Sequence, residues 1–407
     1  MSTDLVAVLS EGTFSEQVLE FAGFLSRSLP EGERAAFVES FQASAQEADE
    51  DESKCAAVLS RVVDEVKGVG EGSERELEGA FNLLTALILY AWEKDEEKRA
   101  EVLAKLSAAV SKEQSGSGFD RAGAKYRILS NIFNALPASS SARLTVFESL
   151  LDVAAAHDEL EYLSDAFSAI PAWLSSWDVP SERKSALLSS VASKLAAADN
   201  HERAYEFLLI HLRFLDSSSP EAAQTAEQVI ASALKLPKVW EFEQLLQIQA
   251  VQALKGKPIF ELLTIFVGGS AEEYKKWEGA NGGEVSRLSL DPAQLDRKMR
   301  LLDLASLCSR SVSTEVPYAE IASVLRVPES EVEAWVIDVI RAGLVSGKLS
   351  QVNSSFRVYR STYRTFGAEQ WQLLEQRLVQ WQSSIDRILA TITEARAGGE
   401  PAAVAAV

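Results

Sequence analysis

Side chains that bind metals or form disulfides are scarce in this sequence. It has two cysteines and three histidines in 407 residues. Cys55 and Cys308 are at positions that look core-facing on helices, so we expect reduced thiols and a reducing compartment. His157, His201 and His211 are scattered, and no cysteine or carboxylate completes a zinc-like set around them. Because no catalytic triad can be assembled either, we expect neither an enzyme nor a bound metal or cofactor.

Long apolar segments are also missing. The longest run, from Leu83 to Trp92, is interrupted by Thr85 and is far shorter than the roughly 20 residues that a membrane-spanning helix needs. The N-terminus lacks the basic region and apolar core of a secretory signal. We therefore expect a soluble, cytoplasmic protein without a membrane contact.

Basic residues are fewer than acidic ones. The chain has 40 Lys and Arg against 60 Asp and Glu, which gives a formal net charge of −20. Within residues 1–120 there are 11 basic and 25 acidic residues. Because this excess of carboxylates repels phosphate, we expect that nucleic acid is not the partner of the N-terminal region.

Helical periodicity is present almost everywhere. The spacing of apolar residues predicts helices at 14–29, 33–47, 54–66, 74–92, 96–111, 121–135, 142–157, 159–168, 181–197, 202–215, 221–236, 240–254 and 258–268. The acidic run Glu47–Glu52 is expected to be a solvated loop, and the Ser/Gly-rich stretch 111–118 a domain boundary. Such helices in antiparallel pairs favour a helical-repeat solenoid, although an irregular helical bundle is the alternative because no repeating consensus is found.

Two short helices and a β-hairpin follow near the C-terminus. The first helix begins after Pro317 and ends before Pro328; the second is expected to open with a capping box between Ser330 and Glu333 and to end at Gly343. The β-prone runs 348–352 and 356–360 are joined by 353–355. This order predicts a winged helix, that is, a helix-turn-helix followed by a β-hairpin.

The last long segment carries the most regular pattern of the chain. Apolar residues alternate at spacings of three and four, with Leu389 widening the stripe: Trp371, Leu374, Leu378, Trp381, Ile385, Ile388 and Ile392. So narrow an apolar stripe predicts a helix that packs against partner helices in a bundle. The alternative is that this helix folds back onto its own solenoid.

Together these patterns predict an all-α fold, in which a helical-repeat solenoid is followed by a winged helix and a long C-terminal helix. We expect an acidic helical region at 1–118, helical repeats at 119–290, the winged helix at 291–364, the heptad helix at 365–396 and a disordered tail at 397–407.

The charges of the winged helix bear on its role. Its second helix carries Glu329, Glu331, Glu333 and Asp338 against Arg341 alone. Because a helix that enters the major groove needs basic or amide side chains, these carboxylates argue against duplex recognition and favour an interaction module.

One basic stretch runs from Arg341 to Gly367 without an acidic residue and is interleaved with Phe356, Tyr359, Tyr363 and Phe366. Such a pattern is typical of surfaces that follow a single-stranded RNA backbone. The candidate RNA contacts are Lys348, Arg357, Arg360 and Arg364. The alternative is that the arginines pair with acidic neighbours and the aromatic rings pack under the C-terminal helix.

The order of these elements resembles the PCI domain, which scaffold subunits of the proteasome lid, the COP9 signalosome and translation initiation factor 3 share. Among these, the sequence is most similar to the initiation factor 3 M subunits, in the stretches Leu262–Val267, Lys298–Leu302, Val332–Asp338, Arg364–Gly367 and Gln370–Trp371. The resemblance implies a noncatalytic scaffold subunit that helps to assemble the preinitiation complex and recruit mRNA. A signalosome or lid subunit, or an RNA-binding module with a basic wing, remains an alternative.

The resemblance also implies partners. These are other subunits of initiation factor 3 and the small ribosomal subunit, directly or through those subunits, with no small-molecule substrate. In PCI assemblies, winged-helix sheets pair edge to edge, so an unpaired edge is expected on the hairpin strand. That predicted wing edge consists of Phe356, Arg357, Val358, Tyr359 and Arg360.

Overall fold

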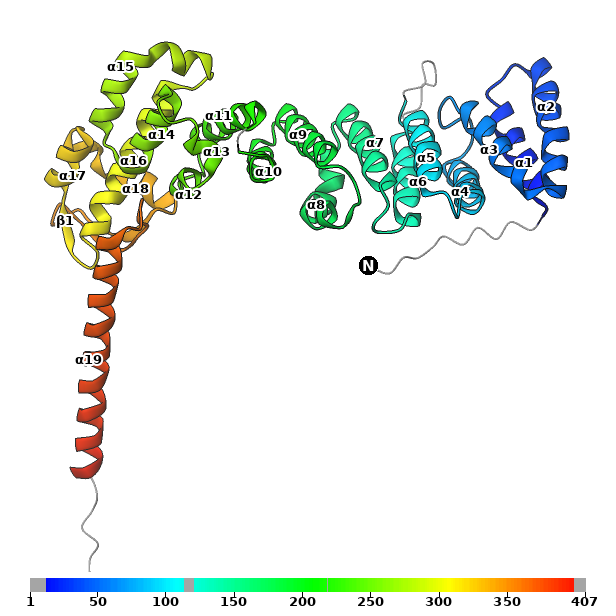
Figure 1. Ribbon diagram of the computed structural model, residues 1–407. Coiled ribbons are helices and arrows are strands. Elements are labelled where there is room, and N and C mark those ends of the chain that lie inside the picture. The colour runs from blue at the N-terminus through cyan, green and yellow to red at the C-terminus, as the bar shows by residue number, and fades with distance from the viewer. Residues whose placement is uncertain (1–11, 113–120, 218, 399–407) are drawn as a thin grey trace, which may run out of the picture. The chain divides into compact units, whose positions relative to one another are not determined.

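The computed structural model describes residues 12–112, 121–217 and 219–398. The described chain is helical apart from one small sheet, and this confirms the predicted fold class (Figure 1). It divides into two compact units, Met1–Leu215 and Asp216–Val407.

In residues 12–112 and 121–215, the regular elements of the first unit are all helices. They are α1 (Phe14–Ser26), α2 (Glu31–Glu50), η1 (Glu52–Lys54), α3 (Cys55–Asp64), α4 (Glu74–Ala91), α5 (Glu96–Ser111), α6 (Ala122–Ala135), α7 (Ala142–Ala156), η2 (Leu160–Leu163), α8 (Ser164–Ser176), α9 (Ser181–Ala197) and α10 (His201–Phe214). α1 and α4 begin with capping boxes at Thr13 and Ser73. In each box the hydroxyl accepts a hydrogen bond from the amide of a glutamate three residues later, whose carboxylate accepts one from the amide of the capping residue.

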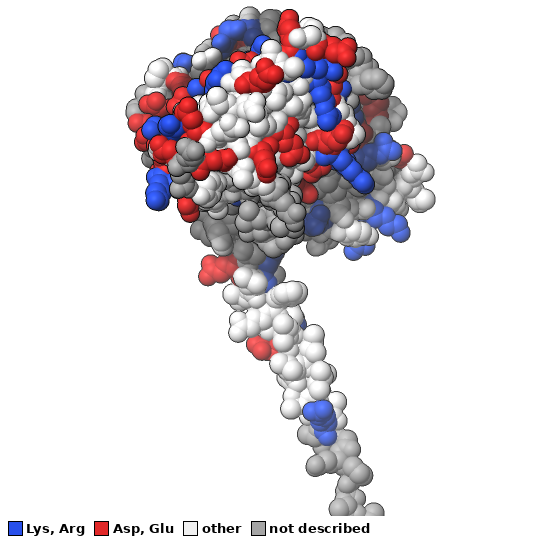
Figure 2. All heavy atoms as spheres, turned by 90° about the vertical axis from the view of Figure 1, so that its right-hand side faces the viewer, with Lys and Arg blue, Asp and Glu red and all other residues white. Residues whose placement is uncertain are grey.

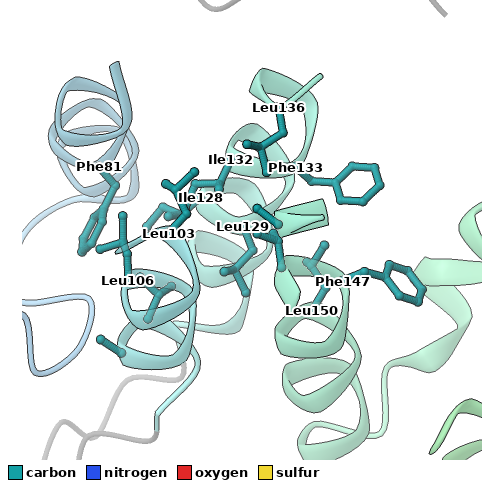
Figure 3. Close-up of a cluster of buried hydrophobic side chains, with 14 of the residues drawn as sticks. Phe81, Leu103, Leu106, Ile128, Leu129, Ile132, Phe133, Leu136, Phe147 and Leu150 are labelled. Atoms are coloured by element: carbon teal, nitrogen blue, oxygen red, sulfur yellow. The ribbon is translucent and has the colours of Figure 1, made fainter. Parts of the chain in front are cut away.

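A single hydrophobic core runs through this unit, from Val18 to Phe207. Figure 3 shows part of it, where Phe81 of α4 and Leu103 of α5 lie beside Ile128 of α6, and Phe147 of α7 follows. The predicted boundary at 111–118 therefore does not separate two cores, and residues 113–118 of it lie outside the described residues.

Two local predictions for this unit are wrong. The acidic run from Glu47 is not a loop, because α2 continues to Glu50 and buries Ala48 in the core. The helix predicted to end at Ser168 continues as α8 to Ser176, with Pro171 inside it, because Ile170 and Leu174 are buried on its inner face.

The second unit begins with further helices. They are α11 (Pro220–Lys235), α12 (Glu243–Leu246), α13 (Gln249–Gln252), α14 (Pro258–Gly268), α15 (Ala271–Arg287) and α16 (Pro292–Arg310). The helix predicted at 240–254 is two short helices, because Ile248 between them is extended (φ −77°, ψ 125°). α15 was not predicted, since it has three glycines, a kink at Asn281 and few buried side chains.

A winged helix follows, as predicted, with its own hydrophobic core. Its elements are β1 (Glu315–Pro317), α17 (Tyr318–Leu325), α18 (Glu329–Arg341), β2 (Val345–Ser350) and β3 (Ser355–Ser361). The capping box predicted at Ser330 is absent, because α18 begins earlier and Pro328 is its N-cap. Gly347 of β2, next to the register shift in its pairing with β3, is required, since a Cβ there would lie 2.3 Å from the Arg357 carbonyl oxygen.

The sheet has the strand order β1-β3-β2, and both pairings are antiparallel. The three-residue strand β1 was not predicted. β3 is therefore the middle strand, with Phe356 and Val358 buried in the winged-helix core. The chain continues from β3 into α19 (Ala368–Gly398), the longest helix of the described residues.

Candidate protein-interaction surfaces

The apolar stripe of α19 is exposed to solvent. Of the seventeen large hydrophobic side chains that are exposed among the described residues, nine belong to this helix. Trp371 is 61% exposed, Trp381 72% and Ile388 59%. In Figure 2 most of the visible surface of α19 is uncharged. Within the unit that carries α19, the other described residues leave this stripe exposed.

The segment that leads into α19 is anchored by Arg364. Its guanidinium donates to the carbonyl oxygens of Ile265 (Nη2, 2.8 Å), Phe266 (Nε, 2.8 Å) and Gly269 (Nη1, 2.8 Å), all at the C-terminal end of α14. This end of the helix dipole favours a cation. The side chain is only 9% exposed, so the prediction that Arg364 contacts RNA is wrong.

Asp303 of α16 completes this anchor. One carboxylate oxygen pairs with Nη1 of Arg364 at 3.3 Å, and the other accepts the amide of Ala271, the first residue of α15, at 2.9 Å. Burial raises the pKa of Asp303, while the backbone bond and Arg364 act in the opposite direction. The carboxylate thus joins the start of α15 to the root of α19.

Aromatic rings pack at the same root. Phe366 meets Tyr363 and Trp371 edge to face, at centroid distances of 5.8 and 4.9 Å. The Phe366 amide donates to the Glu243 carboxylate at 3.1 Å. Arg364 thus pairs with an acidic residue, and the aromatic rings pack at the base of the C-terminal helix. This arrangement is the alternative to an RNA contact that the sequence left open.

Lys298 of α16 is a second buried cation at a helix end. Its Nζ donates to the carbonyl oxygens of Ala233 (2.8 Å), Leu234 (3.3 Å) and Leu236 (2.7 Å) at the C-terminus of α11. The rings of Trp240 and Phe242 lie 5.5 and 5.0 Å from it. Lys298 therefore fastens α11 to α16. Sequence reasoning gave Lys298 no role.

Burial lowers the pKa of Lys298 to about 7. The pKa of a lysine in an unfolded chain is about 10.4. Between these two pKa values the unfolded chain binds more protons than the folded one, so the free energy of unfolding rises with pH. Measured by urea denaturation, the stability of the wild type relative to Lys298→Met should rise by about 2 kcal/mol from pH 7 to pH 9. A difference that stays constant over this range would mean that the three carbonyl acceptors keep the ammonium charged.

The predicted wing edge is wrong. β3 carries Phe356–Arg360 in the middle of the sheet, with β2 paired along its whole length and β1 paired at Ser355–Arg357. The prediction failed because β1 lies about 40 residues earlier in the chain. Of the two longer strands among the described residues, β2 is the one that has a strand neighbour on one side only.

The outer face of the sheet carries the remaining basic residues of the predicted patch. Lys348 and Arg357 are exposed and lie directly opposite each other in the β2–β3 register. Arg360 is also exposed and lies opposite Ser346, and Tyr359 is 54% exposed. Unlike Arg364, these residues are open to solvent.

Two of the four carboxylates of α18 bind other residues of the same unit. Asp338 pairs with Arg297 of α16 at 2.6 Å, and Glu333 accepts bonds from the Tyr318 hydroxyl (3.3 Å) and the Gln351 amide (2.9 Å). Glu329 and Glu331 remain exposed at the start of the helix. The helix thus carries acidic side chains at the positions where a DNA-binding helix carries basic ones.

Neither a metal-binding cluster nor a membrane-spanning segment is found in the described parts of the chain. No three His, Cys, Asp or Glu residues within 12–112, 121–217 and 219–398 could hold a metal ion. None of the helices in these ranges is long and apolar enough to cross a bilayer. The thiols of Cys55 and Cys308 are buried in the core, where the sequence predicts them.

Comparison with known proteins agrees with this architecture. Residues 287–360 match the PCI domain, and residues 364–392, from the anchoring arginine to the end of the apolar stripe, match the C-terminal helix of initiation factor 3 subunit M. The chain is 35% identical over 414 residues to eukaryotic translation initiation factor 3 subunit M of Aspergillus terreus, covering 97% of this chain and 89% of that protein.

Two further relatives carry the same name. The subunit M of Phaeosphaeria nodorum is 35% identical, with 95% of this chain and 88% of that protein covered. The subunit M of Emericella nidulans is 34% identical, with 97% and 91% covered. The matches span both units and the C-terminal helix, so this chain belongs to the family of M subunits of eukaryotic translation initiation factor 3.

Proposed function

We propose that this protein is a noncatalytic scaffold subunit of translation initiation factor 3 in the cytoplasm, which helps to assemble the preinitiation complex on the small ribosomal subunit and to recruit mRNA. The observation that carries the proposal is the exposed apolar stripe of α19 on a chain of this family. A scaffold subunit acts through surfaces that other chains cover, and this stripe is such a surface.

The stripe supports a contact with partner helices. At 1.5 Å per residue, the 31 residues of α19 extend over about 46 Å. Its apolar residues repeat at the heptad spacing, which is the pattern of helices that pack knobs into holes. The partner surface is Trp371, Leu374, Leu378, Trp381, Ile385, Ile388 and Ile392 in a multi-subunit helical bundle. Trp371 and Trp381 are the largest anchors.

The edge of the sheet offers a second contact, which replaces the predicted edge on β3. We infer that β2 (Val345–Ser350) pairs with a strand of a neighbouring subunit, because its outer side has no strand partner among the described residues. Main-chain hydrogen bonds would supply affinity there. In the assembled complex, cross-links from Lys348 to another chain are expected.

The test is affinity purification of the tagged full-length chain from its native lysate at moderate salt, followed by mass spectrometry. Initiation factor 3 subunits together with small ribosomal proteins are the expected result. Signalosome or proteasome-lid subunits in stoichiometric amounts would leave the fold unchanged and overturn the function. Recovery of the chain without other subunits would overturn the scaffold role.

A further inference from the structure

The exposed face of the winged-helix sheet has an arrangement of charges that the fold does not need. Lys348 of β2 and Arg357 of β3 are direct neighbours in register, so their side chains leave the same face. Like charges in directly opposite positions destabilise a sheet. Within the described residues, no ion pair with either side chain is found, whereas some exposed cations of this unit have one, such as Arg297 with Asp338.

The groups around this pair are mostly apolar or basic. Tyr359 lies two residues after Arg357, at the register shift between β2 and β3, and is 54% exposed. Arg360 is exposed at the end of β3. The acidic residue on this sheet is Glu315 of β1, which is opposite Arg357 and accepts a 3.5 Å bond from the Ser355 hydroxyl. The face therefore has net positive charge on a chain whose formal charge is −20.

The chemistry of this face selects its ligand. Two adjacent cations attract an anion, and an exposed tyrosine beside them offers a flat ring for stacking. Single-stranded RNA supplies both a phosphate backbone and unstacked bases, whereas an acidic peptide would leave the ring unused.

We propose that the outer face of the sheet, formed by Lys348, Arg357, Tyr359 and Arg360, binds single-stranded RNA without strong sequence preference. Lys348 and Arg357 contact phosphates and Tyr359 stacks on a base. The site lies on the face of the sheet, so pairing of another chain at the edge of β2 does not compete with it. The inference is independent of the initiation-factor function, because binding is a property of the isolated chain.

Fluorescence anisotropy of a labelled 12-nucleotide oligouridine with the full-length chain tests the proposal at two salt concentrations. The variant Lys348→Glu with Arg357→Glu should weaken binding at least tenfold and lower the salt slope by about 1.4, at 0.7 per phosphate contact on a single strand. Tyr359→Leu should weaken binding about tenfold, as expected for the loss of one stacked base, and Tyr359→Phe should not.

The matched control is Lys255→Glu with Lys276→Glu. Both lysines are exposed residues of the same unit, away from the sheet, and the change in net charge is the same. Circular dichroism checks that every variant is folded. An equal loss of RNA binding in the control would show that net charge alone causes the effect, and it would overturn the site. So would the absence of binding by the wild type at low salt, or displacement by oligoglutamate at lower concentration than by unlabelled RNA.

Discussion

Replacing Trp381 and Ile385 by aspartate should release this protein from the initiation factor complex while its own helices stay folded. The two side chains are 72% and 50% exposed in the isolated chain, so its fold does not depend on them. In a helical bundle both positions would be buried, and an unpaired buried carboxylate there costs about 3–5 kcal/mol. Stoichiometric co-purification with the tagged chain is the measurement.

A matched control separates the apolar stripe from the helix as a whole. Gln376→Asp with Ser383→Asp adds the same charge to α19 on the side away from Trp381 and Ile385, and this variant should co-purify as the wild type does. Circular dichroism should show the same helicity for both variants. If the Trp381 and Ile385 variant still co-purifies in full amount, α19 does not bind its partners through this stripe.

Removing the guanidinium of Arg364 should have the largest effect on stability. Arg364→Ala leaves the carbonyl oxygens of Ile265, Phe266 and Gly269 without their donor, and the buried carboxylate of Asp303 without its cation. Losing one partner of a buried ion pair lowers the free energy of unfolding by about 3–5 kcal/mol. Urea denaturation measures this loss.

Arg364→Lys should recover only part of the loss, because one ammonium cannot reach three carbonyl groups and a carboxylate in the directions that the planar guanidinium serves. Arg360→Ala is the control, since that arginine is exposed and should change the stability by less than about 0.5 kcal/mol. Equal stability of the Arg364→Ala and Arg360→Ala variants would show that the anchor contributes little.

The spacing of apolar residues predicted the helices whose formation depends on residues close together in the sequence. The heptad spacing located α19, and the apolar stripes of Tyr318–Leu325 and Glu329–Arg341 located the helices of the winged helix. β1 escaped prediction because three residues carry no periodicity, and its pairing with β3 joins positions about 40 residues apart. That one missed strand moved the free edge of the sheet from β3 to β2.

The candidate site was predicted in part, for a related reason. In the sequence Arg364 is one basic residue among Lys348, Arg357 and Arg360, and nothing adjacent marks it as buried. Its acceptors are the end of α14, 95 to 99 residues earlier. Lys298 likewise meets carbonyl groups 62 to 65 residues away. Whether a basic side chain binds a partner or the fold itself depends on such distant contacts.

The anchored root of α19 has a consequence for how the complex holds together. Arg364 and Asp303 fasten the helix to the same unit that carries β2. In the proposed assembly, a partner bound at one surface would therefore hold its neighbours near the other surface at high effective concentration. Linked contacts of this kind raise avidity by about 10²–10⁴ over either alone. Removing the anchor between Arg364 and Asp303 should therefore weaken the assembly, although the surfaces of α19 and β2 are not altered. Subcomplexes held by one of these surfaces should exchange subunits faster than the complete factor.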